Sequence, residues 1–277
     1  MQIGEKITRQ LVITRNLFLT FAEPLDMVSR TINGKTRWPT LALRRYAGPL
    51  SSLESSGAEF LAYIKLLCRV PPSARVLDIG CGFGLMALYL EDYIKPPGTY
   101  TGMDINQRAI KWAGKTVTKR HPYFRFIHLD VWNSLYNARG KLLAENLKLP
   151  FDNESSDFIL LKSVFTHMRP KEVENYFKEM ARLLAPDGIC LATFFLLNKE
   201  QQKLQAKGLN SIQFKFGDAL FHYANPAIPE IAIAYEEEEL IRMLQDAGLR
   251  VQNYYYGTWS GKEDGLCFQD MVLIKKN

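Results

Sequence analysis

The middle of the chain alternates short apolar runs with longer amphipathic segments, and this alternation restricts the fold more than any other feature. Apolar runs of strand length cover residues 74–80, 99–105, 123–130, 156–163 and 188–197. Amphipathic segments with helical spacing lie between them at residues 84–95, 107–120 and 170–185. Strands that alternate with helices form βαβ units, in which the strands are parallel. The sequence therefore predicts an α/β fold built on a doubly wound sheet.

The regions on either side of this core predict additions to the sheet. A helical period over residues 55–68 predicts a helix before the first strand. Residues 214–223 alternate like a hairpin and predict a lid-like insertion after the fifth strand. A helix and two closing strands follow, at residues 236–248, 250–257 and 266–276. We expect residues 1–70 to form an N-terminal helical, lid-like extension and residues 71–277 to form one domain.

Composition excludes several classes of protein. The chain is 47% hydrophobic and 23% charged, which is usual for a globular domain and excludes a disordered chain. No apolar run reaches the roughly 18 residues that a membrane span needs, and the start lacks the apolar stretch of a signal peptide. We therefore expect a cytoplasmic protein. No two of the four cysteines have CxxC spacing, so no metal site is predicted, and apolar neighbours make Cys68 and Cys190 core positions.

Positive charge gathers at the start of the chain. Residues 1–50 contain eight lysines and arginines and three acids, a net charge of +5 out of +6 for the whole chain. Such a segment suits nucleic acid, an anionic lipid surface or a phosphorylated substrate. Because the basic residues are dispersed, the sequence favours a solvated surface, and we do not expect nucleic acid as a partner.

A glycine-rich motif follows the first predicted strand and opens the first predicted helix. It reads Gly80-Cys81-Gly82-Phe83-Gly84, a G-x-G-x-G spacing that differs from the G-x-G-x-x-G of dinucleotide-binding proteins. Asp78 stands two residues before the first glycine. A carboxylate there repels a pyrophosphate but attracts a cation. S-adenosylmethionine (SAM), which carries an ammonium and a sulfonium, therefore fits this motif better than a dinucleotide does.

Two further acids end the next two predicted strands. Asp104 follows the glycine motif by twenty residues, where nucleotide-binding α/β folds place a carboxylate for the ribose hydroxyls, and Asp130 ends the third strand. One such acid alone could be a helix N-cap. Three acids at the carboxyl ends of neighbouring strands, together with the glycine motif, predict a ligand site at that edge of the sheet.

With these motifs, residues 70–275 resemble the class I SAM-dependent methyltransferases of the small-molecule type. The matching segments are VLDIGCGFG, YTGMDI, HLDVW, LPFD with SDF, and RLLAPDGICLATFF. Asp187 stands where the family usually has glycine, in a turn away from the cofactor. The resemblance implies a Rossmann-like fold with a seven-stranded, mostly parallel sheet, SAM as the cofactor, and methyl transfer as the activity.

The resemblance also implies which residues hold SAM. The twelve positions are Asp78, Gly80, Cys81, Gly82, Gly84, Asp104, Ile105, Asp130, Val131, Trp132, Lys162 and Ser163. The first five would hold the methionine portion, Asp104 the ribose, and Ile105 one side of the adenine. Asp130 would bind the adenine amino group, and Trp132 would close over the ring. The last two would border the methyl group, although Lys162 is as well explained as an exposed charge at a strand end.

A hydroxyl acceptor benefits from a base near the methyl group, and histidine is suited to that role. His167 follows the fourth strand and His222 lies in the insertion after the fifth, so both are candidates. His128 on a buried strand is predicted to be structural, and His121 at a helix end to be a surface or capping residue. The aromatic residues at 210–235 either line an acceptor pocket or form core, and those of the N-terminal segment, among them Trp38, Tyr46 and Phe60, are expected to be part of a lid over it.

The acceptor is predicted only as a class. The segment after the fourth strand reads SVFTH and not NPPY or DPPY, which favours a small molecule, a glycan or a natural product, methylated at oxygen. Two other functions remain open: a non-catalytic protein that binds a partner with this fold, and a nicotinamide-dependent oxidoreductase. The glycine spacing and Asp78 argue against the second.

Overall fold

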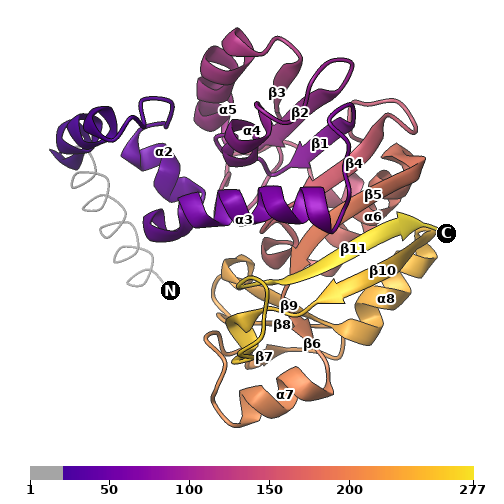
Figure 1. Cartoon of the computed structure of the whole chain (residues 1–277). Coiled ribbons are helices and arrows are strands. Elements are labelled where there is room, and N and C mark those ends of the chain that lie inside the picture. Colours follow the sequence, from indigo (N-terminus) through magenta and orange to yellow (C-terminus); the bar gives the residue numbers. More distant parts are fainter. Residues whose placement is uncertain (1–20) are drawn as a thin grey trace.

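The computed structural model describes residues 21–277, and a seven-stranded sheet forms their centre (Figure 1). The strand order is β10-β11-β5-β4-β1-β2-β3, and in the described chain only β11 runs against its neighbours in this sheet. The strands are β1 (Arg75–Ile79), β2 (Thr99–Asp104), β3 (Phe124–His128), β4 (Ser156–Leu161), β5 (Leu184–Phe194), β10 (Leu249–Tyr255) and β11 (Asp270–Lys276). The predicted seven-stranded, mostly parallel α/β fold is confirmed. From β1 the chain adds β2 and β3 on one side, and from β4 it adds β5 on the other, so the strand order reverses between β1 and β4.

Helices cover both faces of the sheet: α3 (Leu53–Leu66), α4 (Leu85–Leu90), α5 (Gln107–Ala113), α6 (Pro170–Leu183) and α8 (Glu237–Asp246). Two further helices, α2 (Leu41–Tyr46) and α7 (Lys199–Ala206), lie outside its two core layers. Residues 21–32 are also helical. Local chemistry explains where two of them start: Asn106 accepts the Arg108 and Ala109 N–H groups at 3.1 and 3.2 Å, and Pro170 opens α6.

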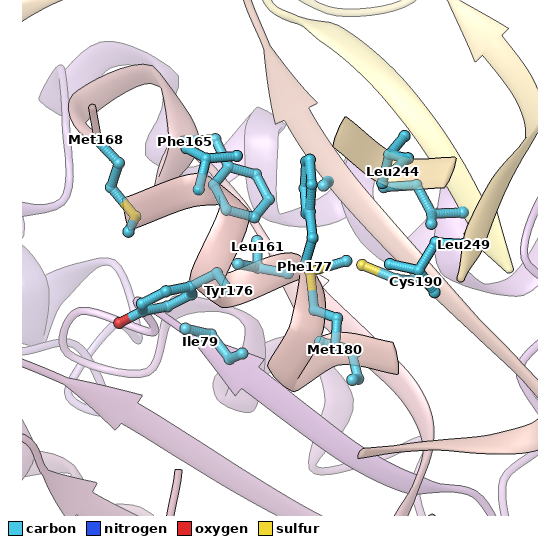
Figure 2. Close-up of a cluster of buried hydrophobic side chains, with 14 of the residues drawn as sticks. Ile79, Leu161, Phe165, Met168, Tyr176, Phe177, Met180, Cys190, Leu244 and Leu249 are labelled. Carbon is cyan, nitrogen blue, oxygen red and sulfur yellow. The ribbon is translucent and has the colours of Figure 1, made fainter. Parts of the chain in front are cut away.

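Two apolar layers hold these helices to the sheet. α6 and α8 pack on one face, where side chains from β1, β4, β5, α6 and α8 meet (Figure 2). On the other face, Phe60 and Ile64 of α3 pack with Met86 and Leu90 of α4 and with the strands. α3 thus shares the core of the sheet, and a domain boundary at residue 70 stays a prediction. Cys68 and Cys190 are buried, as predicted.

A small second sheet and α7 form the insertion after the fifth strand. Its order is β6-β9-β8-β7, built from β6 (Leu196–Leu197), β7 (Phe216–Gly217), β8 (Phe221–Tyr223) and β9 (Ile233–Glu236). β7 and β8 pair antiparallel, as the predicted hairpin requires. In the described residues no helix combines the length and the apolar character that crossing a membrane requires.

Several element bounds differ from the predictions for physical reasons. α4 ends at Leu90, because the N–H groups of Tyr93 and Ile94 both turn back to the Leu90 carbonyl. The helix predicted over residues 107–120 keeps its extent, but it widens into a π turn at Gly114–Thr118. β5 begins at Leu184, before the Pro186-Asp187-Gly188 turn, because an irregularity in its pairing with β4 absorbs that turn into the strand.

Candidate active site

A cavity of about 850 Å³ lies at the carboxyl ends of β1, β2 and β4. Eleven residues predicted from the sequence line it: Asp78, Gly80, Cys81, Gly82, Asp104, Ile105, Val131, Trp132, Lys162, Ser163 and His167. Three predicted residues do not line it: Gly84, Asp130 and His222. The sheet order explains the site, since ligands bind in such folds where the strand order reverses.

The glycine motif forms a tight turn between β1 and α4. Gly80, Gly82 and Gly84 have φ values of +77°, +58° and +83°, which only glycine adopts readily. A Cβ atom on Gly80 would also lie 2.4 Å from Val164 Cγ2. The N–H groups of Gly80 and Cys81 donate to the Met103 carbonyl at 2.8 and 2.9 Å. The turn is therefore fixed to β2, while Gly84 serves the start of α4 and not the cavity.

Asp78 is a buried carboxyl at the floor of the cavity. It is 2% exposed, and the Tyr100 hydroxyl donates to its Oδ2 at 2.5 Å. Burial raises the pKa of Asp78 to about 7, the nearby Asp104 adds to the rise, and the Tyr100 hydrogen bond and Lys162 oppose it. A cation bound beside Asp78 would favour its ionised form.

Asp104 is held at the end of β2 by backbone donors. Its Oδ2 accepts from Gly82 N, and its Oδ1 accepts from Asn106 N, both at 2.7 Å. The Tyr46 hydroxyl reaches the same Oδ1 at 3.3 Å. Burial raises the pKa of Asp104, and these hydrogen bonds oppose the rise. Two fixed carboxylates beside a bare backbone turn match the ammonium and ribose hydroxyls of SAM, so the residues fit that cofactor.

The third acid is oriented differently. Asp130 Oδ1 accepts from Asn137 Nδ2 at 3.3 Å, and the Asp130 carbonyl accepts from the N–H groups of Lys141 and Leu142. These bonds close the loop after β3 and place Val131 and Trp132 on the cavity wall. A role for Asp130 at the adenine amino group stays a prediction.

Lys162 and Ser163 border the cavity at the end of β4. Lys162 Nζ lies 5.0 Å from the centroid of the Phe60 ring, and burial lowers the pKa of Lys162. It is therefore a cavity residue and not an exposed strand-end charge. Ser163 has a φ of +58°, and its Oγ donates to Gln269 Oε1 at 2.9 Å. A non-glycine residue in this conformation is often found at a functional site.

His167 is the histidine that faces the cavity. It ends the short turn Phe165–His167 after β4. Its Nδ1 lies 2.8 Å from the Glu230 carbonyl, which can only accept, so Nδ1 carries the proton. Its Nε2 lies 3.4 Å from the Tyr136 hydroxyl. Burial lowers the pKa of His167, so near neutral pH the ring is uncharged and Nε2 offers a lone pair.

The other histidines lie elsewhere. His222 is on β8, where its Nε2 lies 2.8 Å from Glu236 Oε1. His128 Nε2 lies 3.2 Å from the Ile105 carbonyl, and His121 lies beside Glu91 on the outside of α4. The structure thus brings His167 to the cavity, and it places His222 in the small sheet.

The sequence analysis also missed several residues on the cavity wall, among them Tyr136, Tyr176 and Gln269. Tyr136 sits in the loop after β3, Tyr176 on α6, and Gln269 immediately before β11. The Gln269 carboxamide joins Ser163 to Thr193, whose Oγ1 donates to it at 2.6 Å. No local pattern marks these positions, because only the strand order brings β11 next to β5. Of the aromatic residues predicted to line or cover the pocket, Tyr46 and Phe60 line the cavity. Trp38, which packs against Phe83, and the aromatic residues of 210–235 do not line it.

Comparison with known proteins adds to this geometry. Residues 77–192 match the family described as a methyltransferase domain. The phthiotriol/phenolphthiotriol dimycocerosates methyltransferase of Mycobacterium tuberculosis H37Rv is 36% identical over 141 residues, 49% of this chain and 45% of that protein. The cyclopropane-fatty-acyl-phospholipid synthase of Escherichia coli K12 is 30% identical over 133 residues, 47% of this chain and 29% of that protein. The chain thus spans less than half the length of these curated relatives.

Solved structures agree on the fold. The 1,6-didemethyltoxoflavin-N1-methyltransferase of Burkholderia thailandensis, solved with S-adenosylhomocysteine, has a TM-score of 0.50 at 18% identity over 91% of this chain and 85% of its own. A TehB-like SAM-dependent methyltransferase from Corynebacterium glutamicum has a TM-score of 0.50 at 15% identity, covering 85% and 98% of the two chains. Residues 77–192 thus match a methyltransferase domain, and the described chain shares the fold of SAM-dependent methyltransferases.

Proposed function

We propose that this protein transfers the methyl group of SAM to a hydroxyl of an organic acceptor held in the same cavity. The observation that carries this proposal is the joint placement of two buried carboxylates and one uncharged histidine in a single cavity. Asp78 and Asp104 would bind the cofactor, and His167 would act as the base for the acceptor's hydroxyl; all three line the cavity. The acceptor classes are a small molecule, a glycan or a natural product.

The cofactor half of the cavity explains binding. When bound, SAM supplies an electrophilic methyl group on a sulfonium. The Gly80–Gly82 turn would let the methionine portion lie against backbone, and Asp78 would provide a carboxylate for its ammonium. Asp104 keeps lone pairs for the ribose hydroxyls while Gly82 N and Asn106 N hold the carboxylate in place. Ile105 and Val131 provide an apolar wall for the adenine.

The acceptor half is mainly aromatic. Phe60, Tyr136, Tyr176 and Phe268 line it. Such walls suit an acceptor with an apolar body and one reactive polar group. Two curated relatives are named for dimycocerosate and fatty-acyl-phospholipid chemistry, which supports an acceptor with a lipid-like portion for this chain as well.

His167 is proposed as the base. The Glu230 carbonyl fixes the proton on Nδ1, so Nε2 is the atom that accepts the acceptor's hydroxyl proton. As the oxygen bonds to the methyl carbon, the carbon–sulfur bond breaks and S-adenosylhomocysteine leaves. Alignment of the two reacting atoms in one cavity contributes much of the rate in such displacements.

Thermal unfolding with S-adenosylhomocysteine, SAM and NAD in separate samples tests the proposal. A ligand at one hundred times its dissociation constant stabilises the folded protein by about 2.7 kcal/mol. We expect stabilisation by the first two ligands and none by NAD. Stabilisation by NAD alone would overturn the proposal. An acceptor screen with isotopically labelled SAM then tests oxygen methylation, since an N-methyl or C-methyl product would contradict that part.

A further inference from the structure

The helix over residues 21–32 presents an apolar stripe to the outside of the protein. Phe21, Leu25, Val28 and Ile32 follow one another at spacings of four, three and four, so they share one face. Their exposed fractions are 76%, 76%, 53% and 78%. In Figure 1 this helix lies at the outer edge of the molecule, away from the sheet.

The polar face of the same helix is turned inward. Arg30 pairs with Glu23 and Asp26 at 2.9 and 2.7 Å and donates to the Trp38 carbonyl at 2.8 Å. Arg44 of α2 also pairs with Asp26. A helix that covers a protein core shows the reverse arrangement, with its apolar stripe inward. The Arg44–Asp26 ion pair attaches this helix to α2, and within residues 21–277 the stripe stays exposed.

Charge indicates what covers the stripe. Residues 1–50 carry +5 of the chain's net charge of +6. Lys35, Arg37 and Arg45 follow the helix within this segment. Lys35 pairs with Glu54 and Arg37 pairs with Glu91, but Arg37 and Arg45 are exposed, and Arg45 has no ion pair within residues 21–277. An exposed apolar stripe with neighbouring basic residues matches the surface of an anionic bilayer, where acyl chains take the apolar residues and lipid phosphates attract the cations.

We propose that the 21–32 helix lies on an anionic lipid surface, with its stripe in the lipid. α2, to which the helix is paired, ends at Tyr46, and Tyr46 lines the cavity. Docking would therefore hold the cavity near the membrane, where an amphiphilic acceptor resides. This surface goes beyond the proposed methyl transfer, and its test does not depend on that activity.

Flotation of the full chain with vesicles tests the proposal. We expect binding to vesicles of phosphatidylcholine and phosphatidylglycerol, weaker binding to phosphatidylcholine alone, and weaker binding in high salt. The double variant Leu25→Ser/Val28→Ser should lose at least about tenfold in affinity. The matched control is Leu66→Ser on α3, another exposed leucine (73%), which should bind like the wild type.

The variants are chosen to keep the fold, because the replaced side chains are exposed, and equal melting temperatures check this. A second pair, Phe21→Ser/Ile32→Ser, repeats the test at the ends of the stripe. The proposal would be overturned if the wild type did not bind anionic vesicles, or bound neutral vesicles equally well. It would also be overturned if both double variants bound anionic vesicles as the wild type does. Light scattering that shows a dimer, which the stripe variants make monomeric, would also overturn it in favour of a second copy.

Discussion

The two halves of the cavity are built in different ways. In the cofactor half, Asp78, Asp104 and the glycine turn are bound to one another or to nearby backbone within about one βαβ unit. In the acceptor half, Phe60, Tyr136 and Phe268 come from segments far apart in the chain. The first half is thus fixed by a local motif that a whole family shares, whereas the second depends on how distant segments assemble. The family match therefore predicts the cofactor and leaves the acceptor open.

The largest effect is expected in the cofactor half, from Asp104→Ala. This change removes the acceptor for the ribose hydroxyls, and hydrogen bonds to a charged group contribute roughly 1.5–3 kcal/mol each. We expect the affinity for S-adenosylhomocysteine to fall at least about 100-fold in calorimetry. Asp104→Asn, which keeps one oxygen, should fall less. Wild-type affinity in Asp104→Ala would mean that this carboxylate does not touch the cofactor.

The next effect belongs to the acceptor half. His167→Ala should lower kcat by about 10² to 10⁴, the usual contribution of a general base, with little change in cofactor affinity. His222→Ala is the matched control, because His222 pairs with Glu236 in the small sheet and does not line the cavity. Equal losses in the two variants would show that neither histidine acts as the base.

The pH dependence of kcat follows from the same residue. Burial lowers the pKa of His167 from its ordinary 6.5, so the ring is protonated, and inactive as a base, only at more acidic pH. We expect kcat to rise with pH through a midpoint below 6.5 and then to level off. The residual activity of His167→Ala should lack this rise. A rise that persists in the variant would assign the titration to another group.

Asp78 links the cofactor half to stability. Its pKa is raised from 3.8 to about 7, so the folded protein holds this proton more tightly than the unfolded chain does. Stability from this group is present below pH 3.8 and is lost as pH rises through 7. Asp78→Asn should therefore stabilise the ligand-free protein above pH 7, by up to about 4 kcal/mol. The gain should disappear in acid, and cofactor binding should weaken. Denaturant unfolding at both pH values measures the difference, and an unchanged or lower stability above pH 7 would contradict it.

What the sequence could predict follows the same division. Strand and helix alternation was enough for the α/β fold, and the resemblance to the methyltransferase family added the seven-stranded sheet. The acids and histidine after the strands also identified Asp78, Asp104 and His167, which line the cavity. The sequence could not place Gln269, because its contact with Ser163 needs the antiparallel β11 beside β5, a pairing of residues 106 positions apart. It also could not orient Asp130, whose side chain is held by Asn137 seven residues later in an irregular loop.

The smallest effect should come from Tyr136→Phe. The Tyr136 hydroxyl lies 3.4 Å from His167 Nε2, a long hydrogen bond that an acceptor hydroxyl would replace during the reaction. The ring also packs edge-on against Tyr46 at 5.5 Å, and phenylalanine keeps that contact. We therefore expect kcat to change by less than about threefold, since a weak neutral hydrogen bond contributes under about 1 kcal/mol. A loss comparable to that of His167→Ala would instead make the phenol part of the proton-transfer chain. The acceptor half would then use two coupled groups, and the Tyr136–His167 pair would be the unit to vary in the search for the acceptor.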